Sequence, residues 1–151
     1  MSMFVTLFAG NALPIVSQAK QTKQIETPAL NLSEHVVQTA SGYDIFSPDK
    51  QAKMSVYTKG GQLYYNVTRS GKDFMKESKL GITVNHVEYG KNAVLGTARE
   101  TQEIVRDFQL QGKQKDNQEH CIYTELPITS SDGNAYTIQF KMFNDGVAFH
   151  Y

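Results

Sequence analysis

Apolar and polar residues alternate with a period of two over much of the chain after residue 42. The clearest example is a pair of alternating stretches, 54–58 and 63–67, which flank Gly60 and Gly61. Two adjacent glycines permit the positive φ angles that a tight hairpin turn requires. These residues therefore predict a β-hairpin with one apolar face.

Similar patterns predict strands along the rest of the chain. Residues 111–119 are polar throughout and predict an exposed loop. Short strands separated by turn residues at intervals of about 8–12 residues are typical of a sandwich or barrel, and no helical period competes. The predicted fold class is therefore all-β, an antiparallel β-sandwich. Strands are expected at residues 43–45, 80–84, 94–95, 104–105, 122–128, 136–142 and 147–151, and turns at 47–50, 69–72, 130–134 and 144–146.

The first 19 residues suggest a targeting segment. Residues 4–16 are mostly apolar, but the run is shorter than the roughly 20 residues that a membrane span needs. Ser17 and Ala19 place small residues at the −3 and −1 positions of a cleavage site before Lys20. Residues 1–19 therefore predict a signal peptide, and the protein is expected to be secreted or periplasmic. The alternative is a buried strand or a helix that Pro14 caps.

Residues 20–42 are polar and lack a sustained period, so they predict a leader or linker with one short strand near Val36 and Val37. The sandwich is expected to occupy residues 43–151. Its last alternating strand runs to Tyr151, which would leave a strand edge exposed. We therefore expect that the natural protein continues beyond Tyr151 and that the sandwich is incomplete.

The net charge and the cysteine content argue against several classes of function. The 151 residues contain 15 Lys and Arg and 15 Asp and Glu, so the formal net charge is zero. Nucleic-acid binders and polybasic membrane-docking proteins usually carry a basic excess, so neither class of partner is expected. A single cysteine, Cys121, excludes a disulfide within the chain and a four-thiolate metal site.

Few residues suggest chemistry. Glu119, His120 and Cys121 are consecutive, so on a strand Glu119 and Cys121 would share one face and His120 the other. A metal site needs three or four converging ligands, and we predict instead a half-buried strand without metal. Asp132 and Asp145 precede glycines in turns, and no pair of carboxylates stands out as a glycosidase pair. No catalytic residue is assigned.

Several blocks in a fixed order carry a family resemblance across about residues 43–151. The chain resembles the amino-terminal domain of glycoside hydrolase family 97, whose members are mostly secreted bacterial α-glucosidases and α-galactosidases. The final block is the most specific, and the ordered set is more specific than any single block. The blocks are FSPD at 46–49, GQLYYNV at 61–67, GKDF at 71–74, SKLGI at 78–82 and NDGVAFHY at 144–151.

The resemblance implies a sandwich of the galactose-mutarotase type that packs on a catalytic (β/α)8 barrel of the same protein. It implies calcium in the full-length enzyme, with one glutamate ligand downstream of NDGVAFHY, and therefore no cofactor in this chain. Relatives carry an Asn-His motif on a loop near the barrel. Here Gln118 and Glu119 separate Asn117 from His120. Asn117 and His120 are thus candidates to face an oligosaccharide, with an ordinary polar loop as the alternative.

Three functions compete. The leading hypothesis is a non-catalytic fragment of a bacterial α-glycosidase that supports the barrel and shapes its sugar site. The second is a free-standing, secreted carbohydrate-binding module. Absence of tryptophan argues against it, although Tyr64 or Tyr65 could stack on a sugar. The third is a small secreted barrel for an apolar ligand, which the open end at Tyr151 disfavours.

Overall fold

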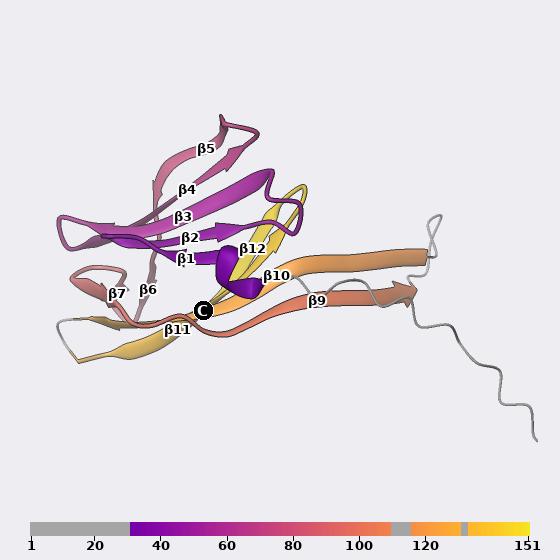
Figure 1. Ribbon diagram of the computed structural model, residues 1–151. Coiled ribbons are helices and arrows are strands. Elements are labelled where there is room, and N and C mark those ends of the chain that lie inside the picture. The colour runs from indigo at the N-terminus through magenta and orange to yellow at the C-terminus, as the bar shows by residue number, and fades with distance from the viewer. Residues whose placement is uncertain (1–30, 110–115, 131–132) are drawn as a thin grey trace, which may run out of the picture.

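The computed structural model describes residues 31–109, 116–130 and 133–151. Two antiparallel sheets lie one over the other (Figure 1). Helix in this part of the chain is limited to the single 3-10 turn Leu32–Glu34. The predicted all-β, antiparallel sandwich is confirmed. The expected signal peptide, residues 1–19, and the first part of the linker lie outside the described residues.

The first sheet has the order β1-β2-β3-β4-β5, and each strand is antiparallel to the next. The hairpin predicted from the sequence is formed by β3 and β4. Gly60 and Gly61 turn it with φ angles of +58° and +76°, which confirms the reason for the two glycines. The strands are β1 (Val36–Gln38), β2 (Gly42–Phe46), β3 (Ala52–Lys59), β4 (Gln62–Arg69) and β5 (Lys72–Lys79).

Strand β1 confirms the short strand predicted near Val36 and Val37, and it pairs with β2. The residue before it, His35, is buried, and its Nδ1 lies 3.0 Å from the carbonyl oxygen of Ser47. The backbone N–H of Phe46 donates to the carbonyl of His35 at 2.8 Å. The first sheet therefore begins before residue 43.

The second sheet has the order β12-β11-β10-β8, and β9 also pairs with β10. Residues 82–89 form a separate small hairpin, in which β6 begins at Ile82. Leu80 is instead a core residue outside the strand, so the prediction of a strand over 80–84 is correct only in its second part. The strands are β6 (Ile82–Val84), β7 (Val87–Tyr89), β8 (Ala93–Leu95), β9 (Arg99–Gln109), β10 (Asp116–Ser130), β11 (Ala135–Phe143) and β12 (Val147–His150).

The core lies between the facing sides of the two sheets. Its members come from alternate positions of the strands, as the period of two requires. Full burial of an aliphatic or phenyl side chain stabilises a fold by about 1.5–3 kcal/mol. The fully buried members are Ile45, Met54, Val56, Leu63, Leu80, Ile122, Leu126, Ile128, Ile138, Phe140 and Met142.

The prediction of a loop over residues 111–119 is wrong for its second part. Residues 116–119 belong to β10, which pairs with β9 in the register Asn117–Phe108 and Glu119–Arg106. This stretch carries no apolar side chain: Gln118 is exposed to solvent, and the buried Glu119 is held by ion pairs with Arg106 and Lys141. Alternation of apolar and polar residues marks a strand only where one face is buried. Residues 110–115 lie outside the described part.

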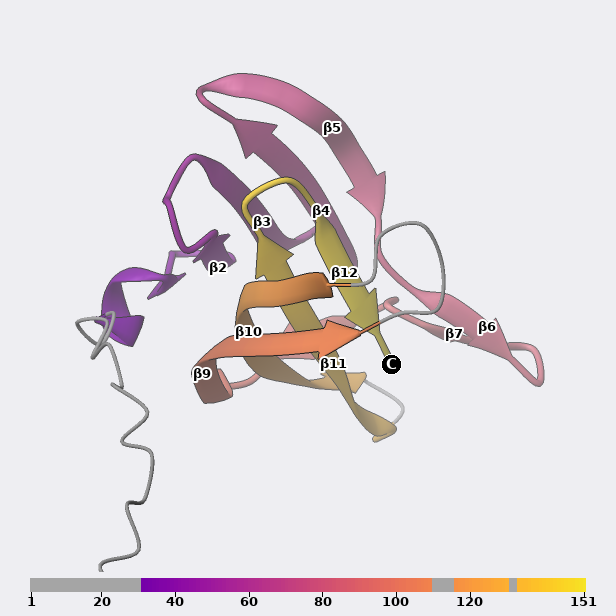
Figure 2. The ribbon, with the colours of Figure 1, turned by 90° about the vertical axis from the view of Figure 1, so that its right-hand side faces the viewer.

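One side of the sandwich is open where β5 and β12 form the edges of the two sheets. Figure 2 shows β5 curving away from β12. Tyr65 and Phe149 bridge the sheets here, with ring centroids 5.6 Å apart in a T-shaped contact. Phe74 on β5 is 66% exposed. The apolar interior is therefore partly accessible at this side.

Candidate functional site

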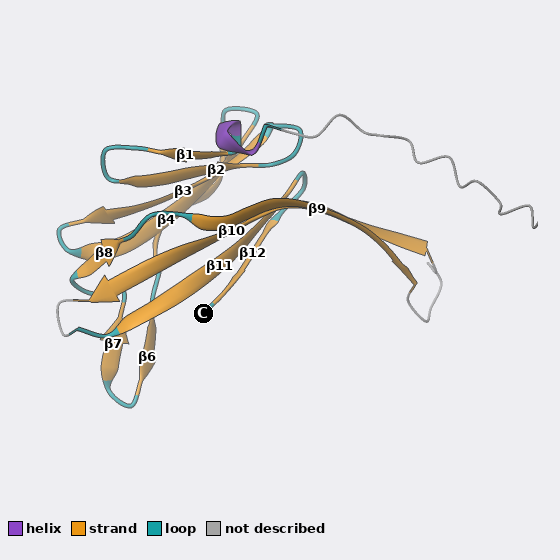
Figure 3. Ribbon diagram, turned by 60° about the horizontal axis from the view of Figure 1, so that its bottom comes forward, coloured by secondary structure: helices purple, strands orange, loops and turns teal. Residues whose placement is uncertain are grey.

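The hairpin of β9 and β10 carries both residues that the sequence suggested as sugar-facing. The pairing runs from Arg99–Glu125 to Gln109–Asp116, with one irregularity near Glu125. In Figures 1 and 3 the distal half of this hairpin projects well beyond the two packed sheets. We call this distal half, residues 103–109 and 116–121, the arm.

The structure does not bring Asn117 and His120 together. They are three residues apart on one strand, so their side chains leave β10 on opposite faces. Asn117 shares a face with Glu119 and Cys121. Cys121 Sγ lies 4.0 Å from Glu119 Oε1, which confirms that these two residues share a face. A single sugar ring on one face of the arm would therefore meet one of the two candidates.

The His120 side chain lies on the second face of the arm, where it contacts a side chain of β9. Its Nε2 lies 2.7 Å from Glu103 Oε1, and both side chains are partly exposed. Next to this pair, Gln118 donates to Asp107 at 2.9 Å. These pairs hold the two strands in register, and their exposed polar atoms can bind hydroxyl groups.

Asn117 borders a hollow of about 400 Å³ whose lining includes Phe108 and Gln109. An amide beside a phenyl ring is a common environment for a sugar, because hydroxyls bind the amide and C–H groups contact the ring. The prediction that Asn117 and His120 face a carbohydrate stays a prediction.

Glu119 is the centre of an ion cluster that the sequence did not predict. Its side chain is only 9% exposed, yet it lies on the outward face of the second sheet. Lys141 Nζ donates to its Oε1 at 2.5 Å, and Arg106 donates to its Oε2. The hydrogen bond from Lys141, followed by that from Arg106, lowers the pKa of Glu119 despite its burial. The carboxylate is therefore ionised and paired at neutral pH.

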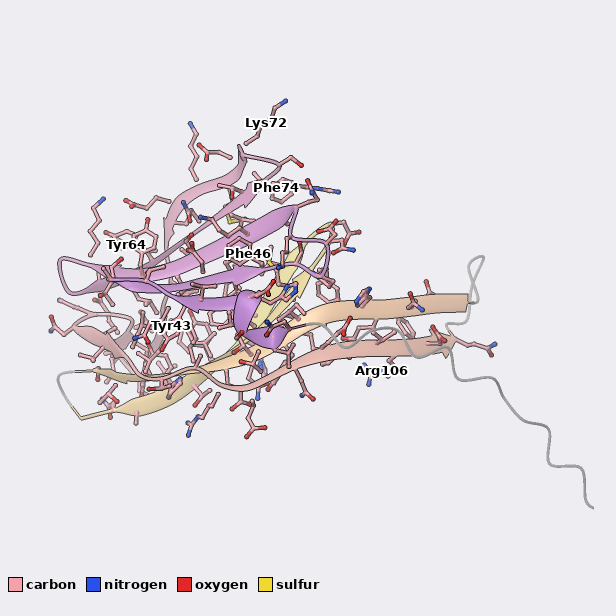
Figure 4. The ribbon with its side chains drawn as sticks, viewed as in Figure 1. Tyr43, Phe46, Tyr64, Lys72, Phe74 and Arg106 are labelled. Atoms are coloured by element: carbon pink, nitrogen blue, oxygen red, sulfur yellow. The ribbon has the colours of Figure 1, made fainter. Side chains whose placement is uncertain are left out.

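A second hollow, of about 470 Å³, opens over this ion cluster. Phe108 from β9 and Phe143 from β11 line it, together with Arg106, Gln118 and Glu119. We call it the Phe108–Phe143 notch. No sequence signal pointed to it, because its lining comes from three strands whose register the sequence does not reveal. Figure 4 shows Arg106 on the arm, far from Tyr64 and Phe74 on the first sheet.

Neither Glu119 nor Glu125 has the raised pKa of a glycosidase acid. A glycosidase acid needs a raised pKa, whereas hydrogen bonds lower the pKa of both Glu119 and Glu125. Burial, followed by the charge of Glu119, raises the pKa of the Cys121 thiol, so it is a poor nucleophile at neutral pH.

The described residues contain no cluster of the side chains that most often hold a metal ion. Calcium takes six to eight oxygen ligands, and in residues 31–109, 116–130 and 133–151 no group of three or more His, Cys, Asp or Glu side chains converges.

In the same residues, no helix has the length and apolar character that crossing a bilayer requires.

Two blocks that carry the family resemblance meet in space. The backbone N–H of Asp49, in the FSPD turn after β2, donates to Asn144 Oδ1 in the turn after β11, at 3.0 Å. Ser47 Oγ donates to Asp49 at 2.6 Å and fixes the first turn. These blocks therefore link the two sheets, and their role in the described structure is to hold the fold.

Comparison with known proteins gives a family and a fold. The family model described as "Glycosyl-hydrolase 97 N-terminal" matches residues 45–151. No curated protein matches the chain significantly.

Solved structures share the fold at low identity. A β-arabinopyranosidase superposes with a TM-score of 0.64 at 20% identity, covering 70% of this chain and 17% of that one. A glycoside hydrolase family 97 enzyme from Pseudoalteromonas sp. strain K8, solved with panose and with acarbose, superposes with a TM-score of 0.62 at 19% identity. The superposition covers 70% of this chain and 16% of that enzyme. The chain thus spans about a sixth of the length of these proteins.

Proposed function

The chain belongs to the glycosyl-hydrolase 97 N-terminal family, and on that premise we propose that it is a non-catalytic domain of a bacterial α-glycosidase. In this proposal it supports a catalytic barrel that acts on α-glucosides or α-galactosides, and it helps to shape the sugar site. The observation that carries the proposal is the match of residues 45–151 to the amino-terminal domain of the family.

The hydrogen bonding of the carboxylates and the shape of the arm favour a non-catalytic role for this domain. The carboxyl groups of Glu119 and Glu125 are ionised and bonded to neighbours within their own sheet. The arm extends beyond the two sheets (Figure 3), and Asn117 and His120 belong to its β10 strand. Such an extension suits contact with another domain and its substrate.

The remaining expectations belong to the same proposal. The oligosaccharide substrate is bound mainly by the barrel, with Asn117 or His120 at its margin. Calcium is expected in the full-length enzyme, as the family resemblance implies. Residues 1–19 direct the protein to the periplasm or to the outside of the cell.

We expect that the purified chain alone hydrolyses neither 4-nitrophenyl α-glucoside nor 4-nitrophenyl α-galactoside, with or without added calcium. The reason is that hydrogen bonds lower the pKa of Glu119 and of Glu125, whereas a glycosidase acid needs a raised pKa. Release of 4-nitrophenol measured by absorbance checks this. Turnover that a single substitution in the chain abolishes would show that the chain has its own active site, and the proposal would fail.

A free-standing carbohydrate-binding module is the second candidate, and one feature favours it. On the outer face of the first sheet, the rings of Tyr57 and Tyr64 lie nearly parallel, with centroids 6.2 Å apart. Tyr57 donates to Glu77 at 2.5 Å, so a carboxylate lies beside the aromatic pair. Tyr65 instead points to the open side and contacts Phe149. Calorimetric titration with maltooligosaccharides tests this candidate, because a module of this kind must give saturable heat.

A further inference from the structure

We propose that the outer face of the first sheet carries a second sugar site, built on the Tyr57–Tyr64 pair and occupied by an α-linked oligosaccharide. Figure 4 shows Tyr64 on the first sheet, away from Arg106 on the arm, so this site is separate from the candidates on β10. The inference goes beyond the proposed function, which requires no sugar on this face. It rests on that function only for the class of sugar, because the proposed substrate is α-linked.

The two tyrosines give the site its apolar surface. Tyr57 on β3 and Tyr64 on β4 are direct cross-strand partners. Their neighbours Val56 and Leu63 are fully buried, so both tyrosine rings point away from the core. The rings are only partly buried, and they lie nearly parallel, with an angle of 22° between their planes. Aromatic ring faces contact the apolar C–H groups of a sugar, while its hydroxyl groups need polar partners beside the rings.

Two charged groups with spare hydrogen-bonding capacity border the rings. Tyr57 donates to Glu77 at 2.5 Å, and Lys59 Nζ donates to both oxygens of Glu77 at 3.0 and 3.2 Å. A carboxylate has about four acceptor positions and an ammonium group has three donors, so these bonds leave both groups able to bind a hydroxyl. Glu77 is 42% exposed and Lys59 is 64% exposed. Lys59 Nζ also lies 5.9 Å from the centre of the Tyr64 ring, so a donor, an acceptor and the rings lie side by side.

Asn66 adds a polar atom that the described part of the protein does not use. It lies two residues after Tyr64 on β4, so its side chain leaves the same face of the sheet. The pairing of β4 with β5 is irregular here, because the register shifts between Tyr65 and Val67. The Oδ1 atom is shielded from solvent and has no hydrogen-bond partner within the described residues. Buried polar atoms are nearly always paired, so rotation of this amide towards a sugar hydroxyl would supply the missing bond.

A purely structural role explains less of this face. Cross-strand aromatic and ion pairs stabilise exposed sheets, and the Tyr57–Tyr64 and Lys59–Glu77 pairs have that effect. That role needs no unpaired amide beside the rings. A protein partner fits less well than a sugar, because it would take the exposed Lys59 and Glu77 out of water.

Calorimetric titration of the full chain with maltoheptaose tests the site. We expect Tyr64→Ala to bind at least about tenfold more weakly than wild type, because the ring contact is lost, whereas Tyr64→Phe keeps the ring and should bind within about twofold. Asn66→Ala should bind several-fold more weakly without a lower Tm, a combination that a structural amide would not give. Phe74→Ala is the matched control and should bind as wild type does. It removes an exposed ring from the same sheet, but one that lines a different hollow, with Val67 and Met142.

The results for the site can be told apart from those for the proposed function. Saturable heat for the wild type that Tyr64→Ala loses supports the site. No saturable heat for the wild type, or equal affinity of wild type and Tyr64→Ala, overturns it and leaves the proposed support of a catalytic domain standing. Equal affinity for cellohexaose would overturn the α-linked class. Failure of the chain to raise the rate of a catalytic domain would instead overturn the proposed function and leave this site standing. Thermal melts of all variants show whether they are folded.

Discussion

Replacing Gly42 with alanine is expected to lower the free energy of unfolding by about 3 kcal/mol or more. A β-carbon at this position would lie 1.9 Å from the carbonyl oxygen of Val56 and 2.7 Å from the Cα of Tyr57. Both atoms belong to the backbone of β3, with which β2 pairs. Side-chain rotation cannot relieve this overlap, so the strands must separate locally and lose core contacts.

Thermal unfolding followed by circular dichroism measures this effect, which should lower Tm by roughly 10 °C. Gly146→Ala is the matched control. A β-carbon on Gly146 meets nothing within 4 Å, so the control should change stability by less than about 0.5 kcal/mol. Equal Tm values for wild type and Gly42→Ala would contradict the close pairing of β2 with β3.

Phe140→Ala should cost about 3–5 kcal/mol, because it removes a phenyl ring from the middle of the sandwich. Phe140 has no exposed surface, and its ring lies 6.0 Å from that of Phe149. The neighbouring strands are fixed by pairing on both sides of β11, so they can close only part of the cavity. Urea titration followed by tyrosine fluorescence gives the change in free energy.

Phe74→Ala is the control for the same chemical change at an exposed position. Phe74 lies on β5, the edge strand at the open side, and most of its ring is in contact with solvent, so its removal should cost less than about 0.5 kcal/mol. A large loss at Phe74 with a small loss at Phe140 would mean that the open side is the true core, which would contradict the sandwich described here.

Local patterns were sufficient to predict the strands that have one buried face. The β3–β4 hairpin follows from its alternation and from Gly60 and Gly61, which adopt the positive φ that the turn needs. The strands near residues 122–128 and 136–142 follow likewise, because Ile122, Leu126 and Ile138 alternate toward the core.

The arm could not be predicted in this way. Residues 117–119 carry no apolar side chain, since Gln118 is exposed and the buried Glu119 is held by ion pairs, and their strand conformation depends on pairing with β9. Pairing between distant segments leaves no mark on a local hydrophobic pattern. The Glu119 cluster could not be predicted for the same reason, because Arg106 and Lys141 belong to neighbouring strands.

The separation of Asn117 from His120 is different, because it follows from spacing alone. Residues three apart on a strand face opposite ways. A loop over residues 111–119 would not impose this geometry, whereas strand β10 does. The notch between Phe108 and Phe143 required the register of three strands, which only the structure provides.

We propose that this chain supports a catalytic domain and does not catalyse hydrolysis itself. The proposal is tested by the rate at which a folded family 97 catalytic domain, lacking its own amino-terminal domain, hydrolyses 4-nitrophenyl α-glucoside with and without the chain. We predict no hydrolysis by the chain alone and a rate for the mixture several-fold above that of the catalytic domain alone. Equal rates with and without the chain, or hydrolysis by the chain alone, would contradict the claim.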